Sequence, residues 1–164
     1  MKKRKIALIL SILLPFILTA QPDMKDMIDL LITNWHNAAA NGDEVAYFNF
    51  MDENAIYIGT DSTEIWTKQA FQEWSKPYFS KGKTWRFKAT KRNIYLSEHN
   101  EIAWFDELLR FPDGTLRGSG VLVYKNGEWK LEHYVLSMPV PNEKFKAINE
   151  LIKNLDPTEA PKEE

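Results

Sequence analysis

An Asn-Gly turn in the second half of the sequence fixes how two long strands pair. Asn126-Gly127 separates two apolar runs, 121–124 and 129–131. Both turn residues tolerate positive φ, so this dipeptide predicts a two-residue type I′ hairpin. Residues that lie directly opposite each other share a face of the sheet. Continuing the pairing from the turn brings Gly120 opposite His133.

A second turn, Phe-Pro-Asp-Gly-Thr at 111–115, fixes the pairing of the preceding strand. Its Pro and Gly positions favour a type I turn closed by a bulge, which brings Asp106 opposite Gly120. Asp106, Gly120 and His133 then form one row, with a residue that has no side chain in the middle, like the wall of a pocket. If the turn instead has a two-residue loop, Glu107 takes the inner position and Asp106 points outward.

Composition and charge exclude several classes of function. The chain has 164 residues, of which 44% are hydrophobic and 27% charged, as in one ordinary globular domain. The first twenty residues hold four basic and no acidic residues, so the remainder carries a net charge of −6. An acidic domain does not attract nucleic acid or anionic membrane surfaces. The absence of cysteine excludes disulfides, a thiol nucleophile and thiolate metal sites.

The N-terminus has the pattern of a signal peptide. A basic run at 2–5 precedes an apolar stretch at 6–18, and Ala20 is a small residue suited to cleavage. A stretch of thirteen residues is too short to span a bilayer, which needs about 20. We therefore expect an exported protein, periplasmic or secreted, that keeps no stable membrane anchor after cleavage.

Apolar spacing and turn residues divide the rest of the chain into helices and strands. We expect one domain at 21–155 and a disordered, acidic tail at 156–164. Helices are predicted at 22–41, after Asp43, at 67–79 and at 142–155, and strands at 55–59, 85–96, 101–111, 115–125 and 128–137. Helices followed by a long antiparallel sheet give an α+β fold. Such long strands coil, so three helices pack on the concave face of a cone and leave a cavity.

Five strings of residues resemble a known group of proteins. The chain is similar, over about residues 30–142, to the SnoaL-like domains of the nuclear transport factor 2-like superfamily, in an exported bacterial subfamily. The matching strings are Trp-His-Asn-Ala-Ala-Ala (35–40), Tyr-Ile-Gly-Thr-Asp-x-x-Glu-x-Trp (57–66), Ala-Trp-Phe-Asp-Glu-Leu-Leu (103–109), Arg-Gly-Ser-Gly-Val-Leu (117–122) and Trp-Lys-Leu-x-His-Tyr-Val-Leu-Ser (129–137). The resemblance implies a cone-shaped, cystatin-like fold and frequent dimers. The superfamily contains isomerases, dehydratases and hydrolases as well as members that catalyse no reaction, so the resemblance does not decide which function this chain has.

Asp106 and His133 are the candidate catalytic residues. A carboxylate and an imidazole on an apolar face suit general acid–base catalysis without a cofactor, and the competing interpretation is a hydrogen-bonded pair in the core. Aromatic residues and the central glycine are the candidate ligand-binding residues: Tyr47, Tyr57, Trp66, Trp74, Trp104, Gly120 and Trp129. No spacing of histidines predicts a metal site, and no glycine-rich phosphate loop predicts a nucleotide cofactor.

The predicted outer face of the sheet is also apolar. The Asn-Gly pairing places Val121, Val123, Tyr134 and Leu136 there, and four such side chains left in water favour a homodimer.

We expect an exported domain that binds a small, partly apolar organic molecule in its cone. The alternatives are a cofactor-free isomerase, dehydratase or hydrolase using Asp106 and His133, and a non-catalytic dimeric interaction module whose cavity is filled by its own side chains.

Overall fold

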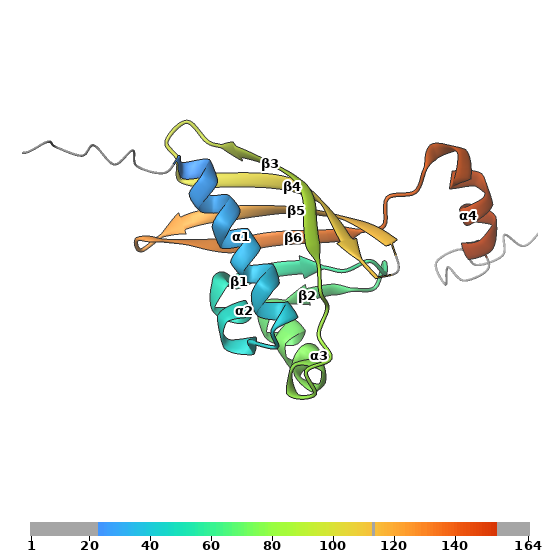
Figure 1. Cartoon of the computed structure of the whole chain (residues 1–164), viewed down its shortest axis with the longest axis horizontal. Coiled ribbons are helices and arrows are strands. Elements are labelled where there is room, and N and C mark those ends of the chain that lie inside the picture. Colours follow the sequence, from blue (N-terminus) through green and yellow to red (C-terminus); the bar gives the residue numbers. More distant parts are fainter. Residues whose placement is uncertain (1–22, 113, 154–164) are drawn as a thin grey trace, which may run out of the picture.

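The computed structural model describes residues 23–112 and 114–153, so the predicted signal peptide and acidic tail lie outside the described residues. Three helices come first along the chain, interrupted by two strands, and four long strands follow (Figure 1). The helices are α1 (Met24–Ala40), α2 (Glu44–Phe50) and α3 (Lys68–Ser80). The strands are β1 (Met51–Ile58), β2 (Ile65–Thr67), β3 (Lys88–Leu96), β4 (Ile102–Phe111), β5 (Gly114–Lys125) and β6 (Glu128–Ser137).

The three predicted helices are confirmed, and each begins at a polar capping residue. The side chains of Asp23, Asp43 and Thr67 accept hydrogen bonds from backbone N–H groups in the first turns of α1, α2 and α3. Helix α1 ends at Ala40, and Gly42, which follows the cap residue Asn41, has a φ of 72°, the left-handed conformation common just after a helix C-terminus. The apolar stripe of α1, which includes Ile28, Ile32 and Trp35, is buried as its spacing predicted.

The strands form one six-stranded sheet in the order β2-β1-β6-β5-β4-β3. The four long strands are antiparallel to one another, as predicted, but β6 pairs with β1 in parallel on its other side. The short strand β2 is a correction to the sequence analysis, which expected a loop there. It pairs with β1 through its backbone, and its polar surroundings give no alternating pattern that would reveal it.

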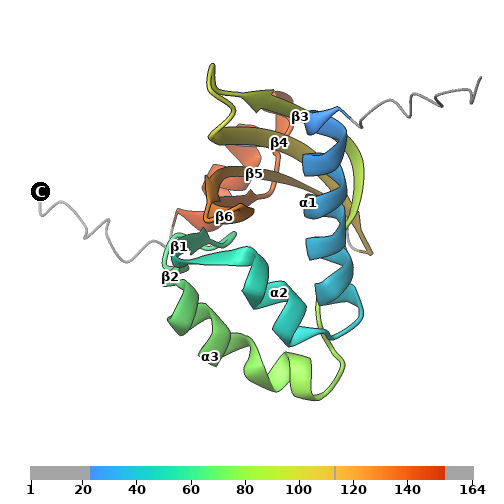
Figure 2. The same cartoon turned by 90° about the vertical axis from the view of Figure 1, so that its left-hand side faces the viewer.

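The core lies between the concave face of the curved sheet and helices α1, α2 and α3 (Figure 2). Alternate residues of β4 and β5 are buried, which marks the face that points toward the helices. The opposite face, called the outer face below, is only half-buried or exposed. The α+β fold with a curved sheet is therefore confirmed, with a mixed rather than purely antiparallel sheet.

The Asn-Gly hairpin is confirmed, but its pairing does not continue to His133. Asn126 and Gly127 have φ values of 53° and 86°, and the predicted pairing holds from the turn to Leu122 and Leu131. Beyond that point β6 contains a β-bulge at Glu132, so His133 lies opposite Val121. One extra residue moves every later side chain to the other face. His133 therefore points outward.

The turn between β4 and β5 has the two-residue loop that was the alternative interpretation. Phe111 pairs with Gly114, which leaves only positions 112 and 113 in the loop. Asp106 consequently lies opposite Ser119 and points outward, while Glu107 lies opposite Gly118 on the inner face. The preferred prediction for Asp106 is wrong because it assigned one residue too many to the turn.

The C-terminal part stands apart from the sheet. A 3-10 turn, η1 (Asn142–Lys144), leads into helix α4 (Phe145–Ile152), which lies beyond the end of the strands (Figure 1). The predicted helix is thus confirmed as far as Ile152. Within the described residues, no helix has the length and apolarity needed to cross a membrane.

Candidate functional site

A buried carboxylate at the centre of the sheet contacts three charged or polar side chains. Glu107 is buried on the inner face of β4. Its Oε1 accepts a hydrogen bond of 2.9 Å from the Tyr134 hydroxyl and lies 2.8 Å from Nε2 of His36. A carboxylate only accepts hydrogen bonds, so Nε2 of His36 carries the proton. The other carboxylate oxygen of Glu107, Oε2, accepts a hydrogen bond of 2.9 Å from Nε of Arg92. These four residues are called the Glu107 cluster below.

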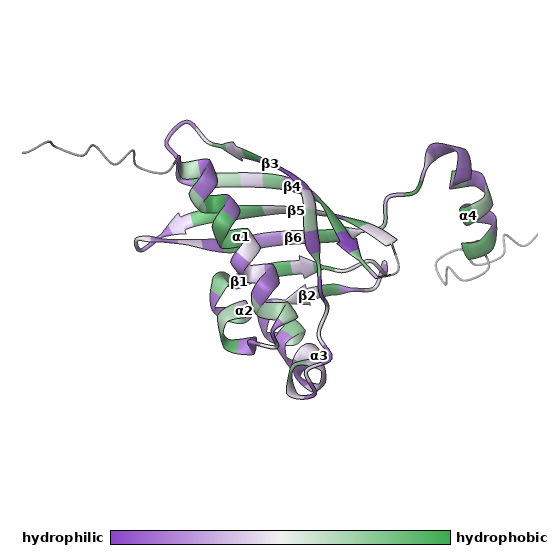
Figure 3. Cartoon of the chain, in the orientation of Figure 1, coloured by the Kyte–Doolittle hydropathy of each residue, from purple (hydrophilic) through white to green (hydrophobic). Residues whose placement is uncertain are grey.

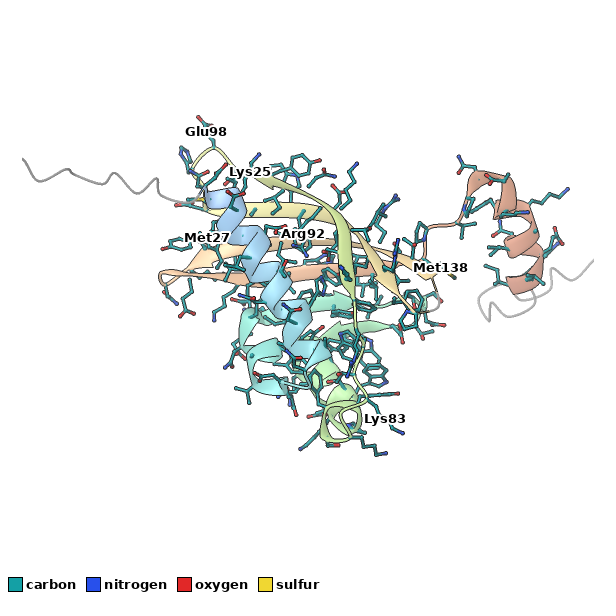
Figure 4. All side chains as sticks on the ribbon, viewed as in Figure 1. Lys25, Met27, Lys83, Arg92, Glu98 and Met138 are labelled. Carbon is teal, nitrogen blue, oxygen red and sulfur yellow. The ribbon has the colours of Figure 1, made fainter. Side chains whose placement is uncertain are left out.

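Arg92 ties this cluster to helix α1. Its Nη1 donates to the backbone oxygen and the carboxylate of Asp29 and to the hydroxyl of Thr33. Asp29, Thr33 and His36 are four and three residues apart, which places them on one face of the helix, toward the sheet. Figure 4 labels Arg92 beside α1, over the sheet. The cluster therefore fastens α1 to the middle of the sheet.

The electrostatics of Glu107 favour the ionised form. Burial alone raises the pKa of this carboxyl, but the hydrogen bond and charge of His36 and the guanidinium of Arg92 outweigh it, so the pKa lies below its usual range. Burial and the neighbouring Glu107 carboxylate raise the pKa of the Tyr134 hydroxyl well above its usual range. A general acid or base works best with a pKa near the ambient pH, and neither group has one. The arrangement suits a structural anchor.

The two predicted catalytic residues do not belong to this cluster. Asp106 lies on the outer face and accepts hydrogen bonds of 3.0 and 3.2 Å from the side-chain amide of Asn93. His133 lies on the same outer face, opposite Val121 and beside Ile56 of β1. The proposed inner row of Asp106, Gly120 and His133 is therefore wrong, for the two pairing reasons given above.

Most of the predicted ligand-binding residues form the core. Tyr47, Tyr57 and Trp129 are buried, and Tyr57 stacks on Phe71 with ring centroids 4.1 Å apart. The space beside Gly120 is taken by the ring of Phe105, whose nearest carbon would lie 2.7 Å from an added Cβ. Gly120 therefore makes room for a core side chain and not for a ligand.

Three predicted residues reach the surface. Trp104 lies on the outer face, whereas Trp66 of β2 packs against Trp74 of α3, with ring centroids 5.7 Å apart. Trp74 lines a surface pocket of about 370 Å³ whose other walls are Pro77, Tyr78, Lys81 and Lys83. Gly82, with a φ of 60°, lies just after the end of α3, between the two lysines (Figure 4 labels Lys83).

The outer face carries a row of side chains that crosses five strands. Paired positions place Ile56, Tyr95, Trp104, Val121 and His133 side by side, and they are called the outer row below. Tyr95 and Trp104 are each 44% exposed, and their rings stack with centroids 5.8 Å apart. Val121 and Val123 lie on this face as predicted, but Tyr134 and Leu136 are buried inside because of the bulge. Large aromatic side chains held open on a sheet mark a surface suited to binding.

The buried cluster that Glu107 forms with His36, Arg92 and Tyr134 was not predicted from the sequence. His36 falls at the edge of the apolar stripe of α1, which was the available signal, and Glu107 was named as the alternative inner residue. Nothing in the sequence around Arg92 predicts its partners on α1, 59 and 63 positions away. Among residues 23–112 and 114–153, no group of three or more His, Cys, Asp or Glu side chains is placed to hold a metal ion.

Comparison with known proteins identifies the family. The model of the SnoaL-like domain matches residues 28–141, which is most of the chain. The chain belongs to the SnoaL-like domain family. No curated protein matches the sequence of this SnoaL-like domain.

Solved structures similar to this SnoaL-like domain share its fold at low identity. An NTF2-like protein of unknown function from Pseudomonas putida is 16% identical, with a TM-score of 0.61, over 73% of this chain and 89% of that one. An uncharacterised protein with a cystatin-like fold from Caulobacter vibrioides is 14% identical, with a TM-score of 0.60, over 77% of this chain and 96% of that one. The association domain of CaMKII from C. elegans is 17% identical, with a TM-score of 0.57, over 70% of this chain and 95% of that one.

Proposed function

We propose that this SnoaL-like domain is a non-catalytic association module, in which two copies of the chain bind each other through the outer face of the sheet. The observation that carries this proposal is the outer row, where Tyr95 and Trp104 form a stacked, exposed aromatic pair. Burying an aromatic side chain of this kind contributes about 1.5–3 kcal/mol. The solved association domain of CaMKII with the same fold gives the proposal a precedent in another protein.

The packing of the interior also supports an association role over a catalytic one. Trp35, Tyr47, Tyr57 and Phe71 fill the space between the sheet and the helices with rings in mutual contact. The carboxylate of Glu107 is buried beneath α1, and its hydrogen-bond partners are side chains of this chain. A substrate has no route to that carboxylate while α1 is docked. The proposed site of action is therefore the exposed outer face of the sheet. We further propose that the protein is exported by a signal peptide at residues 1–20 and self-associates after export.

Replacing Trp104 with glutamate should weaken self-association of the mature protein. A charge in place of a central aromatic residue typically costs about 2 kcal/mol or more, so the dimer dissociation constant should rise about 30-fold or more. Sedimentation equilibrium measures that constant. Trp74→Glu is the matched control, because Trp74 is a similarly exposed tryptophan on the other side of the molecule. Equal dissociation constants for the two variants would refute the assignment of the outer face.

The pocket beside α3 favours a second candidate function, binding of a small, partly apolar anion. Trp74 and Tyr78 have ring centroids 5.1 Å apart and provide flat walls for a ring-shaped molecule. Lys81 and Lys83 add positive charge, and neither forms an ion pair within the described part of the chain. The ligand is still a small, partly apolar molecule, as expected from the sequence, but its proposed site is on the surface and not in the interior of the cone.

Binding of the fluorescent probe 8-anilinonaphthalene-1-sulfonate tests the pocket, because the probe combines aromatic rings with one negative charge. We expect Trp74→Ala and Lys83→Glu each to weaken probe binding about tenfold, which is a loss of about 1.4 kcal/mol. Trp104→Ala removes a tryptophan from the outer face and serves as the control. If Trp104→Ala weakens binding and the two pocket variants do not, the pocket is not the binding site.

A further inference from the structure

Asparagine directly precedes glycine at two places in the chain, at 41–42 after helix α1 and at 126–127 in the turn between β5 and β6. In this dipeptide the backbone nitrogen of glycine can attack the side-chain carbonyl carbon of asparagine, because glycine has no side chain that hinders the approach. The attack needs a glycine nitrogen that is accessible to solvent base and a backbone that is free to rotate. The structure meets these needs at one of the two places.

The hairpin turn leaves the nitrogen of Gly127 open to attack. Asn126 and Gly127 are both exposed, and apart from the chain neighbours no described atom lies within 4 Å of an added Cβ at Gly127. Within the part of the chain that the structure describes, the N–H of Gly127 donates no hydrogen bond. Figure 3 shows this turn as a hydrophilic tip at the end of the sheet away from α4. The adjoining pair, Lys125 and Glu128, is the last of its ladder, and ladder ends open most readily.

The same dipeptide at 41–42 is held by hydrogen bonds. The N–H of Gly42 donates to the carbonyl oxygen of Ala39 at 2.9 Å, and the N–H of Asp43 donates to that of Ala38 at 2.8 Å. Both alanines are buried, and the side chain of Asp43 caps the next helix, α2. Rotation of the backbone here would break these bonds and displace the junction between two helices that pack on the core.

We propose that Asn126 is a site of spontaneous deamidation in the folded protein and that its fold protects Asn41. The nitrogen of Gly127 loses its proton to solvent base and bonds to Cγ of Asn126, and the side-chain nitrogen leaves as ammonia. The product is a five-membered succinimide ring. Water then adds to one of the two ring carbonyl carbons and opens the ring, which leaves either aspartate or isoaspartate. One water is consumed and one ammonia is released, and the reaction is independent of the proposed self-association.

The two products have different effects on the hairpin. Aspartate before glycine also favours a type I′ turn, so the aspartate product keeps the pairing of Lys125 with Glu128. Isoaspartate carries the main chain through the former side chain, which adds one backbone atom to a turn whose geometry fits two ordinary residues. Asn126 also lines a cleft of about 560 Å³ together with Lys125 and Lys130. Either product therefore adds a negative charge to that cleft.

Peptide mass spectrometry of the folded protein during incubation at mildly alkaline pH tests the proposal. We expect Asn126 to convert at least about tenfold faster than Asn41, which is a difference of about 1.4 kcal/mol in the activation barrier. Asn100 is a second reference, because it shares the positive φ, at 55°, but precedes the larger Glu101 and should stay unchanged. In concentrated urea the two Asn-Gly dipeptides should convert at similar rates. Equal rates at Asn126 and Asn41 in the folded protein, or the same difference in urea, would overturn the proposal.

Urea unfolding of the separated products tests the effect on the turn. The variant Asn126→Asp reproduces the aspartate product and should unfold at the same urea concentration as fresh wild type. The isoaspartate product, isolated by chromatography from aged protein, should unfold at a lower urea concentration. Equal midpoints for the two products would contradict the stated role of the two-residue turn.

Discussion

Replacing Glu107 with alanine should lower the free energy of unfolding by about 3–5 kcal/mol, the usual loss when one partner of a buried ion pair is removed. The change leaves the Arg92 guanidinium and the His36 ring without their acceptor under α1. Urea unfolding at a fixed protein concentration measures the effect, since dimerisation makes stability depend on concentration. Asp106→Ala is the matched control and should cost less than about 1 kcal/mol, because Asp106 is half-buried and, within the described residues, its carboxylate bonds only to Asn93.

The pH dependence of the stability lost in a further variant, Glu107→Gln, checks the cause. The folded pKa of Glu107 lies below its unfolded value, so the ionised carboxylate contributes its full stabilisation above the unfolded pKa, about 4.3. That contribution is lost as the pH falls through the folded pKa. The stability difference between wild type and Glu107→Gln should therefore be constant from pH 7 to about 5 and shrink below about 4. A difference that stays unchanged down to pH 2 would show that Glu107 is not held as a carboxylate.

Gly118→Ala should destabilise the fold by about 3 kcal/mol, although alanine is otherwise acceptable in a strand. An added Cβ would overlap the Tyr134 hydroxyl and lie 2.8 Å from Oε1 of Glu107. The change both overpacks the core and displaces a hydrogen bond to a buried charge. The neighbouring Ser119→Ala, whose side chain is exposed on the other face, should stay within about 0.5 kcal/mol.

A double-mutant cycle makes this prediction specific. Tyr134→Phe removes the hydroxyl that the new methyl group would meet, so Gly118→Ala should cost at least about 1 kcal/mol less in that background. Both proteins are compared by urea unfolding. If the two changes are simply additive, the methyl group does not act through the Tyr134 hydroxyl and the stated reason for the glycine is wrong.

The fold was predictable because short local sequence patterns, such as capping residues and turn dipeptides, mark its turns and helix ends. Asp43 and Thr67 predicted helix starts, and Asn126-Gly127 predicted a hairpin whose first pairs are those observed. The residues that face inward were harder to predict, because one residue more or less exchanges the two faces of a strand. A bulge at Glu132 exchanged the two faces of β6 beyond that point, and a two-residue loop after Phe111 exchanged the two faces of β4, relative to the prediction.

The Glu107 cluster was less accessible from sequence because its members come from separate elements. His36 lies 71 positions before Glu107, and their contact depends on how α1 crosses the sheet. The expected chemistry, a carboxylate beside an imidazole, does occur at the centre of the molecule. It is made by Glu107 and His36 in place of Asp106 and His133, and it is enclosed. The proposed site of action is therefore the outer face of the sheet and not the interior.

Hydroxyl-radical footprinting of the wild-type protein at low and high concentration tests most directly whether the outer face is where this domain works. Tyr95 and Trp104, each 44% exposed, are compared with Tyr78 and Trp74, which are 43% and 39% exposed on the side of α3. Association through the outer face predicts that oxidation of Tyr95 and Trp104 falls several-fold on concentration, while oxidation of Tyr78 and Trp74 stays constant. Constant oxidation of all four residues, or protection of the α3 pair alone, would contradict the account.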